Sequence, residues 1–322
     1  MSGVPTLRGA VDADALGATL MHEHVFVVNP EIVENLPTDW DEESALVDAA
    51  RRLDELYGAG IHTIVDLTVI GLGRSIRRLL RVPITTGLNI VVATGLYTFY
   101  DVPSYFKFRK TDVLVSHFAR EIEDGISDTG VRAGILKCAT DEAGVTPGVE
   151  KVLRAVARAQ LRTGVPISTH THAGTRRGLD QLRIFAEEGV DPTRVVIGHS
   201  GDTTDMDYLL AVADSGAYLG MDRFGIDTIL GFDERVATVA RLCELGRADQ
   251  IVLSHDASCH IDYFAGGRPP KALPSWHYLH IIRDVVPALK SRGVTDEQIT
   301  QMLVVNPRRV LGGLNWGRSH SE

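Results

Sequence analysis

Two histidines separated by one residue, His22 and His24, lie in a short apolar run near the start of the chain. Because side chains in a strand alternate between its two faces, both imidazole rings would lie on the same face. Imidazole is a common protein ligand for zinc and related transition metals. An isolated pair could be a coincidence, but single histidines, His170 and His199, also end two later apolar runs. Together, the four histidines predict a metal site.

Lys137 lies inside another apolar run, residues 133–140, where its ammonium would be buried. Burial beside divalent cations disfavours the charged form and favours the neutral amine. A neutral amine can add CO2 to become a carbamate, which carries a negative charge and has two oxygens able to bridge two metal ions. Considered alone, Lys137 is better explained by a nearby carboxylate partner or by an ammonium that reaches solvent. The histidines shift the interpretation toward the carbamate.

Asp256 ends the last apolar run, in the sequence Ser254-His255-Asp256. Its carboxylate could serve both as a hard metal ligand and as a carrier of protons during catalysis. The alternative is that Asp256 is the N-cap of a helix that follows this run, which is a common position for Asp.

Eight short runs rich in Val, Ile and Leu recur along the chain. They cover residues 19–26, 62–68, 89–95, 133–140, 165–171, 194–200, 217–223 and 250–256. Near-continuous apolar runs of this length are typical of parallel strands buried on both faces. Helical spacing of apolar residues follows between them, most clearly at 42–57, 148–162 and 235–246. The alternation predicts one (β/α)8 (TIM) barrel, with residues 1–322 as a single domain. A doubly wound open sheet is the alternative, although no GxGxxG follows the first run.

Two signals near the C-terminus predict helix starts. Thr295 and Gln298 have the spacing of a capping box, in which each side chain satisfies a free backbone N–H of the first turn. Asn306-Pro307 predicts the opening of a further helix, because proline fits the first helical position.

Polar residues end every one of the eight runs at its C-terminal side. They are His22 and His24, Asp66, Thr94, Lys137, His170, His199, Asp222 with Arg223, and Asp256. Barrel enzymes place their active sites at this face. An unpaired neutral polar group in such a position costs roughly 2–7 kcal/mol, and a charge costs more. We therefore expect these side chains to converge on one another or on bound ions.

Composition and charge disfavour nucleic-acid-binding and membrane proteins. The chain has 42 acidic and 33 basic side chains, a formal net charge of −9, and no long basic run, so a nucleic-acid partner is not expected. No apolar run approaches the ~18 residues that span a bilayer, and the N-terminus lacks the apolar segment of a signal peptide. Three cysteines without a CxxC pair fit a reducing compartment. We expect a cytoplasmic protein that does not bind membranes.

The motifs resemble the amidohydrolase superfamily and, more narrowly, the phosphotriesterase-like lactonases. The resemblance runs from about Leu7 to Arg309 through LMHEHVF, GILKCATDE, PISTHTHAG, RVVIGHSGD, GMDRFG, LSHDA and NPRRVL. It implies two divalent metal ions per chain, with zinc preferred and cobalt, manganese or iron as alternatives. His22, His24 and Asp256 would bind the more buried ion, and His170 and His199 the more exposed one. Lys137, as N6-carboxylysine, would bridge both.

The resemblance also implies a reaction. A hydroxide bridging the two ions would attack a lactone carbonyl, and Asp256 would carry the proton to the leaving alkoxide. Tyr97 would contact the lactone ring and Arg223 would fix the loops above the pocket. Taken by themselves, these two residues could equally be a packed aromatic and a surface ion pair.

By this resemblance we expect N-acyl-homoserine lactones, which are quorum-sensing signals, as the main substrates, with phosphotriesters hydrolysed as a side activity. The short segment after the seventh run, Phe224–Asp233, is like that of the lactonases. Apolar residues could line a groove for the acyl chain, or could contact a second subunit. The predicted substrate contacts are Val27, Leu72, Phe99, Ile226 and Tyr263, and also Tyr97 and Arg223.

Alternatives are a dedicated organophosphate triester hydrolase and a hydrolase of other γ- or δ-lactones. A barrel without enzymatic activity is disfavoured because none of the six ligands is missing. By the same resemblance we expect a homodimer, with the aromatic cluster after the third run at the contact. This cluster comprises Tyr97, Phe99, Tyr100, Tyr105, Phe106 and Phe108.

Overall fold

Eight parallel strands form one sheet in which neighbours in space are also neighbours in the chain, as a computed structural model of residues 3–313 describes it. The strands are β3 (Thr19–Glu23), β5 (Thr63–Asp66), β6 (Asn89–Gly95), β7 (Ile135–Thr140), β8 (Ile167–Thr171), β9 (Val195–Ile197), β10 (Tyr218–Met221) and β11 (Ile251–Leu253). The chain after β11 returns to β3, where the Asp256 N–H donates to the His22 carbonyl at 3.0 Å. The sheet is thus nearly closed into a barrel, which confirms the predicted fold.

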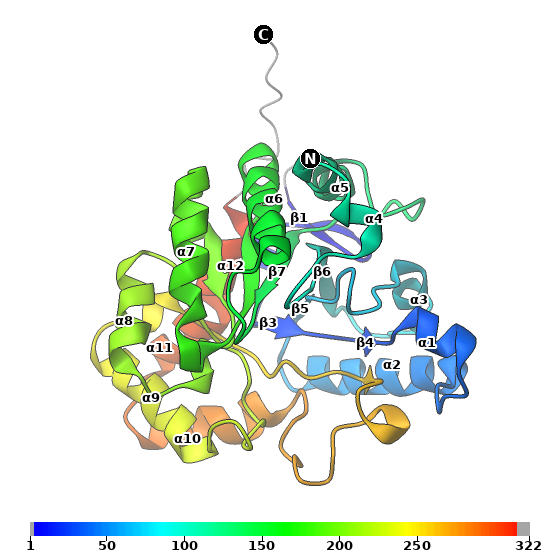
Figure 1. Cartoon of the computed structure of the whole chain (residues 1–322). Coiled ribbons are helices and arrows are strands. Elements are labelled where there is room, and N and C mark those ends of the chain that lie inside the picture. The colour runs from blue at the N-terminus through cyan, green and yellow to red at the C-terminus, as the bar shows by residue number, and fades with distance from the viewer. Residues whose placement is uncertain (1–2, 314–322) are drawn as a thin grey trace.

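Helices cover the outside of the barrel (Figure 1). They include α2 (Glu42–Gly58), α3 (Ile76–Leu80), α5 (Thr111–Glu123), α6 (Pro147–Thr163), α7 (Arg177–Glu188), α8 (Met206–Asp214), α9 (Phe232–Glu244) and α10 (Val286–Ser291). The predicted helices at 42–57 and 148–162 correspond to α2 and α6, and the one at 235–246 begins three residues earlier, as α9. The side chains of Asp41 and Thr146 cap α2 and α6.

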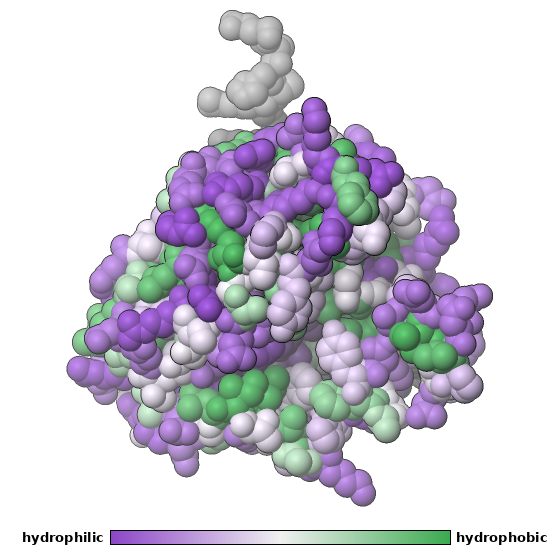
Figure 2. Space-filling model, in the orientation of Figure 1, coloured by the Kyte–Doolittle hydropathy of each residue, from purple (hydrophilic) through white to green (hydrophobic). Residues whose placement is uncertain are grey.

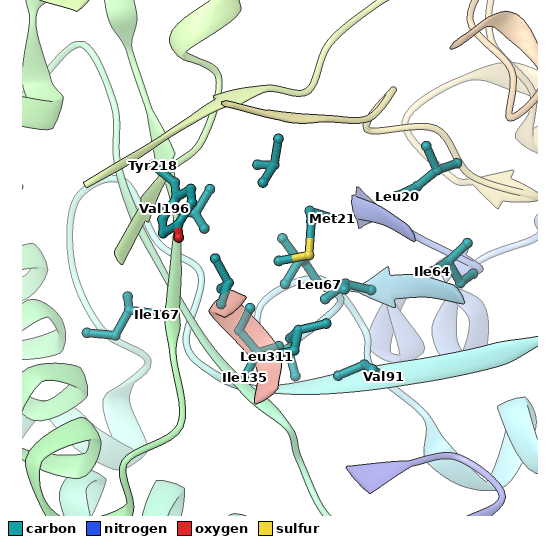
Figure 3. Close-up of a cluster of buried hydrophobic side chains, with 14 of the residues drawn as sticks. Leu20, Met21, Ile64, Leu67, Val91, Ile135, Ile167, Val196, Tyr218 and Leu311 are labelled. Atoms are coloured by element: carbon teal, nitrogen blue, oxygen red, sulfur yellow. The ribbon is translucent and has the colours of Figure 1, made fainter. Parts of the chain in front are cut away.

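The barrel interior is apolar below the level of the predicted site. Figure 3 shows Met21, Leu67 and Ile135 from the strand region gathered with Leu311, which comes from α12 (Asn306–Gly312). All four side chains are almost completely buried. The face of the molecule in Figure 2 is largely hydrophilic, with small separate apolar clusters. Among residues 3–313, no helix is long and apolar enough to cross a membrane.

Five strands end earlier than predicted. Regular pairing stops at Glu23, Asp66, Ile197, Met221 and Leu253, before the predicted ends at Phe26, Thr68, Ser200, Arg223 and Asp256. For β9 and β11 the reason is local backbone geometry, since His199 and Asp256 have φ of 59° and 56° and cannot continue a ladder. Their side chains therefore stand just beyond the strand ends, at the mouth of the barrel. Whether residues 1–322 are a single domain stays a prediction, because residues 1–2 and 314–322 lie outside the described range.

The C-terminal helices correct one prediction. The capping box of Thr295 and Gln298 is present at the start of α11 (Asp296–Thr300). Asn306-Pro307, however, does not open a separate helix, because a π-helical turn (Gln301–Val305) joins α11 directly to α12. Pro307 has no N–H for the regular i→i−4 ladder, and the wider turn before it takes up that mismatch.

A buried ion pair fastens α5 to the segment after β5. Arg74 makes two hydrogen bonds to the Glu121 carboxylate, at 2.6 and 2.7 Å, and the Thr94 hydroxyl donates a third at 2.5 Å. The Glu121 side chain is only 3% exposed. Burial by itself would raise the pKa of Glu121, but the hydrogen bonds and charge of Arg74 lower it below its usual value.

We predict that Glu121→Gln destabilises the protein by about 3 kcal/mol at pH 7, because it leaves the Arg74 charge buried without a partner. The folded pKa of Glu121 lies below its unfolded value, so this stabilisation is present above the unfolded pKa and is lost as pH falls through the folded pKa. Urea unfolding at pH 7 and below pH 4 measures both effects. Asp128→Asn, which breaks the exposed pair with Arg77, is the control and should leave stability essentially unchanged. An equal loss for Glu121→Gln at both pH values would contradict a role for the charge.

Candidate metal centre

The structure brings the first two histidines against the end of the eighth strand. The His22 Nε2 lies 3.3 Å from Asp256 Oδ1, and the His24 Nε2 lies 3.0 Å from the same oxygen. His22 is on β3 and His24 follows it, so the strand alternation directs both rings to the barrel mouth as predicted. The Nδ1 atom of His24 is held by the Thr68 hydroxyl at 2.8 Å. One carboxylate oxygen and two imidazole nitrogens thus converge.

In the second pair of histidines, two ring nitrogens face each other in a way that favours a bound cation. His170 Nδ1 and His199 Nε2 are 2.9 Å apart. The opposite nitrogen of His170 lies 2.7 Å from Asp141, and that of His199 lies 2.9 Å from Asp222. A carboxylate accepts hydrogen bonds, so each histidine donates outward and its inner nitrogen carries a lone pair. Two lone pairs at this distance repel each other unless a positive ion lies between or above them.

A proton does not readily fill that role. Burial lowers the pKa of His170 to about 4 and that of His199 well below its usual value. The Tyr97 hydroxyl, 3.1 Å from His170 Nδ1, can donate to only one of the two lone pairs. A divalent metal ion accepts both, and imidazole suits zinc, cobalt or iron. The donor set therefore fits a metal ion.

Lys137 reaches the first pair of histidines. Its Nζ is 3.2 Å from His22 Nε2, and the side chain is 1% exposed. Burial lowers the pKa of the Lys137 amine to about 8, although the charges of Asp256 and Asp222 oppose the shift. This shift enlarges the neutral fraction of the amine, which is the form that adds CO2. Gly95 of β6 makes room for this strand, because a Cβ there would stand 1.9 Å from the Lys137 carbonyl oxygen.

The two histidine pairs belong to one site. Ligand atoms from His22, His199 and Asp256 lie within 4.8 Å of one another. The rings of His22 and His199 are also stacked, with centroids 4.8 Å apart. The six residues predicted as ligands therefore share one pocket, and their role as ligands stays a prediction.

Asp222 is a functional candidate that the sequence indicated only by its position. Its Oδ2 accepts from His22 Nδ1 at 2.8 Å, and its Oδ1 accepts from His199 Nδ1 at 2.9 Å. The Asp222 carboxylate thus orients one histidine ligand of each of the two predicted metal ions. Two glycines make the space for it, since a Cβ at Gly198 or Gly220 would stand 3.2 or 2.7 Å from Asp222 Oδ2. In the sequence, the glycines just before His199 and Asp222 are the signal that could have indicated this role for Asp222.

Arg223 and Asp256 form an ion pair at the mouth. Arg223 Nε donates to Asp256 Oδ2 at 3.0 Å, and its Nη1 donates to Asp202 Oδ2 at 3.0 Å. Burial would raise the pKa of Asp256, but the neighbouring His22, His24 and Arg223 hold it well below its usual value. The N-cap alternative for Asp256 is wrong, because the segment after it forms the short strand β12 (His260–Ile261) and no helix.

A cavity of about 170 Å³ opens above the six candidate ligands. Six of the seven predicted substrate contacts line it, namely Val27, Leu72, Tyr97, Arg223, Ile226 and Tyr263. Phe99 does not, although its ring packs 5.0 Å from the His170 ring. Trp276 also lines the cavity, and no signal in the sequence pointed to it. The remaining wall residues are Ile229, Ile261 and Phe264.

A parallel barrel with His, Lys and Asp side chains gathered at its mouth defines the amidohydrolase class of hydrolases. Within that class, the chain belongs to the phosphotriesterase family, which it matches over residues 2–311. It is 60% identical to the phosphotriesterase homology protein of Mycobacterium tuberculosis over 96% of this chain and 98% of that one. It is 40% identical to the aryldialkylphosphatase of Saccharolobus solfataricus, covering 94% and 97%. The solved structure of the phosphotriesterase from Mycobacterium tuberculosis superposes with a TM-score of 0.93, at 60% identity and with 96% and 98% coverage.

We predict that Asp222→Asn weakens metal binding by roughly 10–100-fold, because an amide cannot accept from both imidazoles at once. Competition of the metal-loaded protein with a chromogenic chelator measures the affinity directly. Asp214→Asn, which alters an exposed partner of Arg247, is the matched control and should bind metal as the wild type does. An unchanged affinity in Asp222→Asn would mean that the carboxylate serves only the packing of the barrel.

Proposed function

We propose that this protein hydrolyses lactones, and N-acyl-homoserine lactones in particular, at a centre of two divalent metal ions. The ions would be held by His22, His24, Lys137, His170, His199 and Asp256, with Lys137 carboxylated and bridging. The observation that carries the proposal is the character of the cavity above these residues. It is lined by apolar side chains from several loops, and among residues 3–313 Arg223 is the one lysine or arginine side chain besides Lys137 that lines it.

The state of Arg223 favours a neutral substrate. Its guanidinium already donates to Asp256 and Asp202, so it is not available to pair with a carboxylate or phosphate dianion of a substrate. This half-buried guanidinium would have to weaken its two ion pairs, to Asp256 and Asp202, in order to bind a second anion. Lactones and phosphotriesters are both neutral esters and meet this constraint.

When bound, the two metal ions would acidify a water molecule and polarise the ester carbonyl. The residues around them would complete the reaction. Water adds to the carbonyl carbon, the ring C–O bond breaks, and the proton passes through the Asp256 carboxylate to the leaving alkoxide. Asp256 Oδ2 is held by Arg223 at 3.0 Å, and this contact fixes the direction of the carboxylate.

Tyr97 would bind the lactone ring. Its hydroxyl is 3.1 Å from His170 Nδ1, one of the candidate ligand atoms. Burial raises the pKa of Tyr97 well above its usual value, so the hydroxyl stays protonated and can donate to a substrate oxygen. The apolar wall of Val27, Leu72, Ile226 and Tyr263 would then receive the start of the acyl chain. Between Arg223 and α9 the chain has only residues 224–231, and Ile226 and Ile229 of this short segment line the cavity.

The second candidate is the hydrolysis of organophosphate triesters as the main activity. It is favoured by the relative from Saccharolobus solfataricus, which is named aryldialkylphosphatase. Other γ- or δ-lactones are a third possibility for the same cavity. We further propose that the protein works in the cytoplasm, which accords with three buried free cysteines.

The test compares hydrolysis of a long-chain N-acyl-homoserine lactone, a simple alkyl lactone and a phosphotriester, with metal content determined on the same sample. We expect the acyl lactone to have the highest kcat/KM and about two metal ions per chain. Lys137→Ala should lose both the metal and the turnover, whereas Lys290→Ala, which alters an exposed lysine, should keep both. Two bound ions with faster phosphotriester hydrolysis would reverse the order of the candidates. Neither metal nor turnover, after divalent ions and bicarbonate are supplied, would overturn the proposal.

We also propose a homodimer. The aromatic segment after β6 exposes Tyr100, Tyr105 and Phe108 by 68, 61 and 86%. Exposed aromatic clusters of this kind are typical of protein contacts. We expect light scattering of the native protein to give twice the mass of one chain, and Phe108→Glu to give a single chain. A wild-type mass of 35.1 kDa would contradict this prediction.

A further inference from the structure

The turn made by residues 255–257 gives Asp256 an unusual backbone conformation. Asp256 has φ of +56°, which is the left-handed region that residues other than glycine seldom adopt. After this residue the chain runs on beside residues 22–27 as far as β12, and the Asp256 carboxylate lines the cavity at the barrel mouth. Such a conformation persists only where the surroundings hold it. Two side chains from distant parts of the sequence hold this turn.

Glu23 holds the N–H side of the turn. Its two carboxylate oxygens accept from the backbone N–H groups of His255 and Ala257, at 3.0 and 2.9 Å. These residues flank Asp256. Glu23 is itself completely buried and is fixed by the Ser254 hydroxyl at 2.8 Å and by His255 Nδ1 at 2.7 Å. Because Glu23 lies between His22 and His24, the segment that carries two candidate ligands also shapes the turn that carries a third.

Trp276 holds the carbonyl side. Its indole Nε1–H donates to the carbonyls of His255 and Asp256, at 3.0 and 3.1 Å. The backbone at Trp276 packs closely on Gly225, where a Cβ would stand 2.8 Å from the Trp276 Cα, and the indole meets the Phe264 ring edge-on at 6.1 Å. The Asp256 N–H donates to the His22 carbonyl, so both sides of the turn are tied to the barrel.

We propose that Glu23 and Trp276 are positioning residues for Asp256: together they impose the left-handed turn that aims its carboxylate. In that orientation Oδ1 lies 3.0 Å from His24 Nε2, and Oδ2 lies 3.0 Å from Arg223 Nε. Without the two hydrogen-bonding groups the turn relaxes toward an extended backbone, and the carboxylate swings away from these partners. This inference rests on the proposed metal centre, but not on the identity of the substrate.

The experiment compares two substitutions of the same residue. Trp276→Phe keeps an aromatic ring against the cavity and removes the N–H. Trp276→His loses bulk, but its Nε2–H has the same place in the five-membered ring as the indole Nε1–H. We expect metal affinity, measured by competition with a chelator, to fall about tenfold or more in Trp276→Phe and to be largely restored in Trp276→His. The visible spectrum of the cobalt-loaded protein should change in Trp276→Phe alone.

Kinetics on the best substrate of the wild type give a second measure. Misaiming the carboxylate should lower kcat about 10–100-fold in Trp276→Phe, with KM changed by less than roughly threefold. Glu23→Gln should act in the same direction, because an amide can accept from only one of the two N–H groups. If Glu23→Gln does not fold, the order of the two Trp276 variants decides the question alone.

Asn306→Leu is the matched control. The Asn306 side chain also donates to two backbone carbonyls, those of Ala248 and Ile251, but at the opposite end of β11. It should lower stability while metal affinity and the cobalt spectrum stay as in the wild type. The proposal is overturned if Trp276→Phe behaves like Asn306→Leu, or if Trp276→His is the weaker metal binder of the two Trp276 variants. Failure of the proposed function would give a different result, because the wild type itself would then bind no metal or hydrolyse no lactone.

Discussion

At the mouth of this barrel, two buried imidazole nitrogens, His170 Nδ1 and His199 Nε2, face each other at 2.9 Å. The carboxylates of Asp141 and Asp222 accept the protons of the two opposite ring nitrogens, and so they fix the direction of both inner lone pairs. Protonation meets the resulting demand for positive charge poorly, because burial disfavours imidazolium. The arrangement of the remaining polar residues at the mouth follows from this demand.

The surrounding structure keeps the donor atoms together without a ladder of regular hydrogen bonds. His199 and Asp256 both have positive φ, and each is held by side chains that bind the adjacent backbone. Asp222 accepts from the His199 N–H at 2.7 Å, and Glu23 accepts from the N–H groups on either side of Asp256. The strands end just before these residues. The barrel therefore supplies a rigid support, and the carboxylates of Asp222 and Glu23 orient the side chains of His199 and Asp256.

The fold and the six candidate ligands could be predicted because both depend on local sequence. An apolar run that ends in a histidine, lysine or aspartate indicates a buried strand and a polar mouth without knowledge of the rest of the chain. The lengths of β9 and β11 could not be predicted, since backbone turns at His199 and Asp256 shorten them. Nor could the contact of Trp276 with Asp256, because it joins residues 20 positions apart across irregular backbone.

At this site, bound metal ions and loss of the Lys137 charge would favour each other. Without metal ions, the carboxylates of Asp141, Asp222 and Asp256 exceed the available cations, Lys137 and Arg223, so the site is slightly negative. In the proposed loaded site, two divalent ions would reverse that balance and make an ammonium at Lys137 unfavourable, whereas a carbamate there would add one negative charge. A small positive excess would remain, and it would stabilise the oxyanion that forms on a neutral ester.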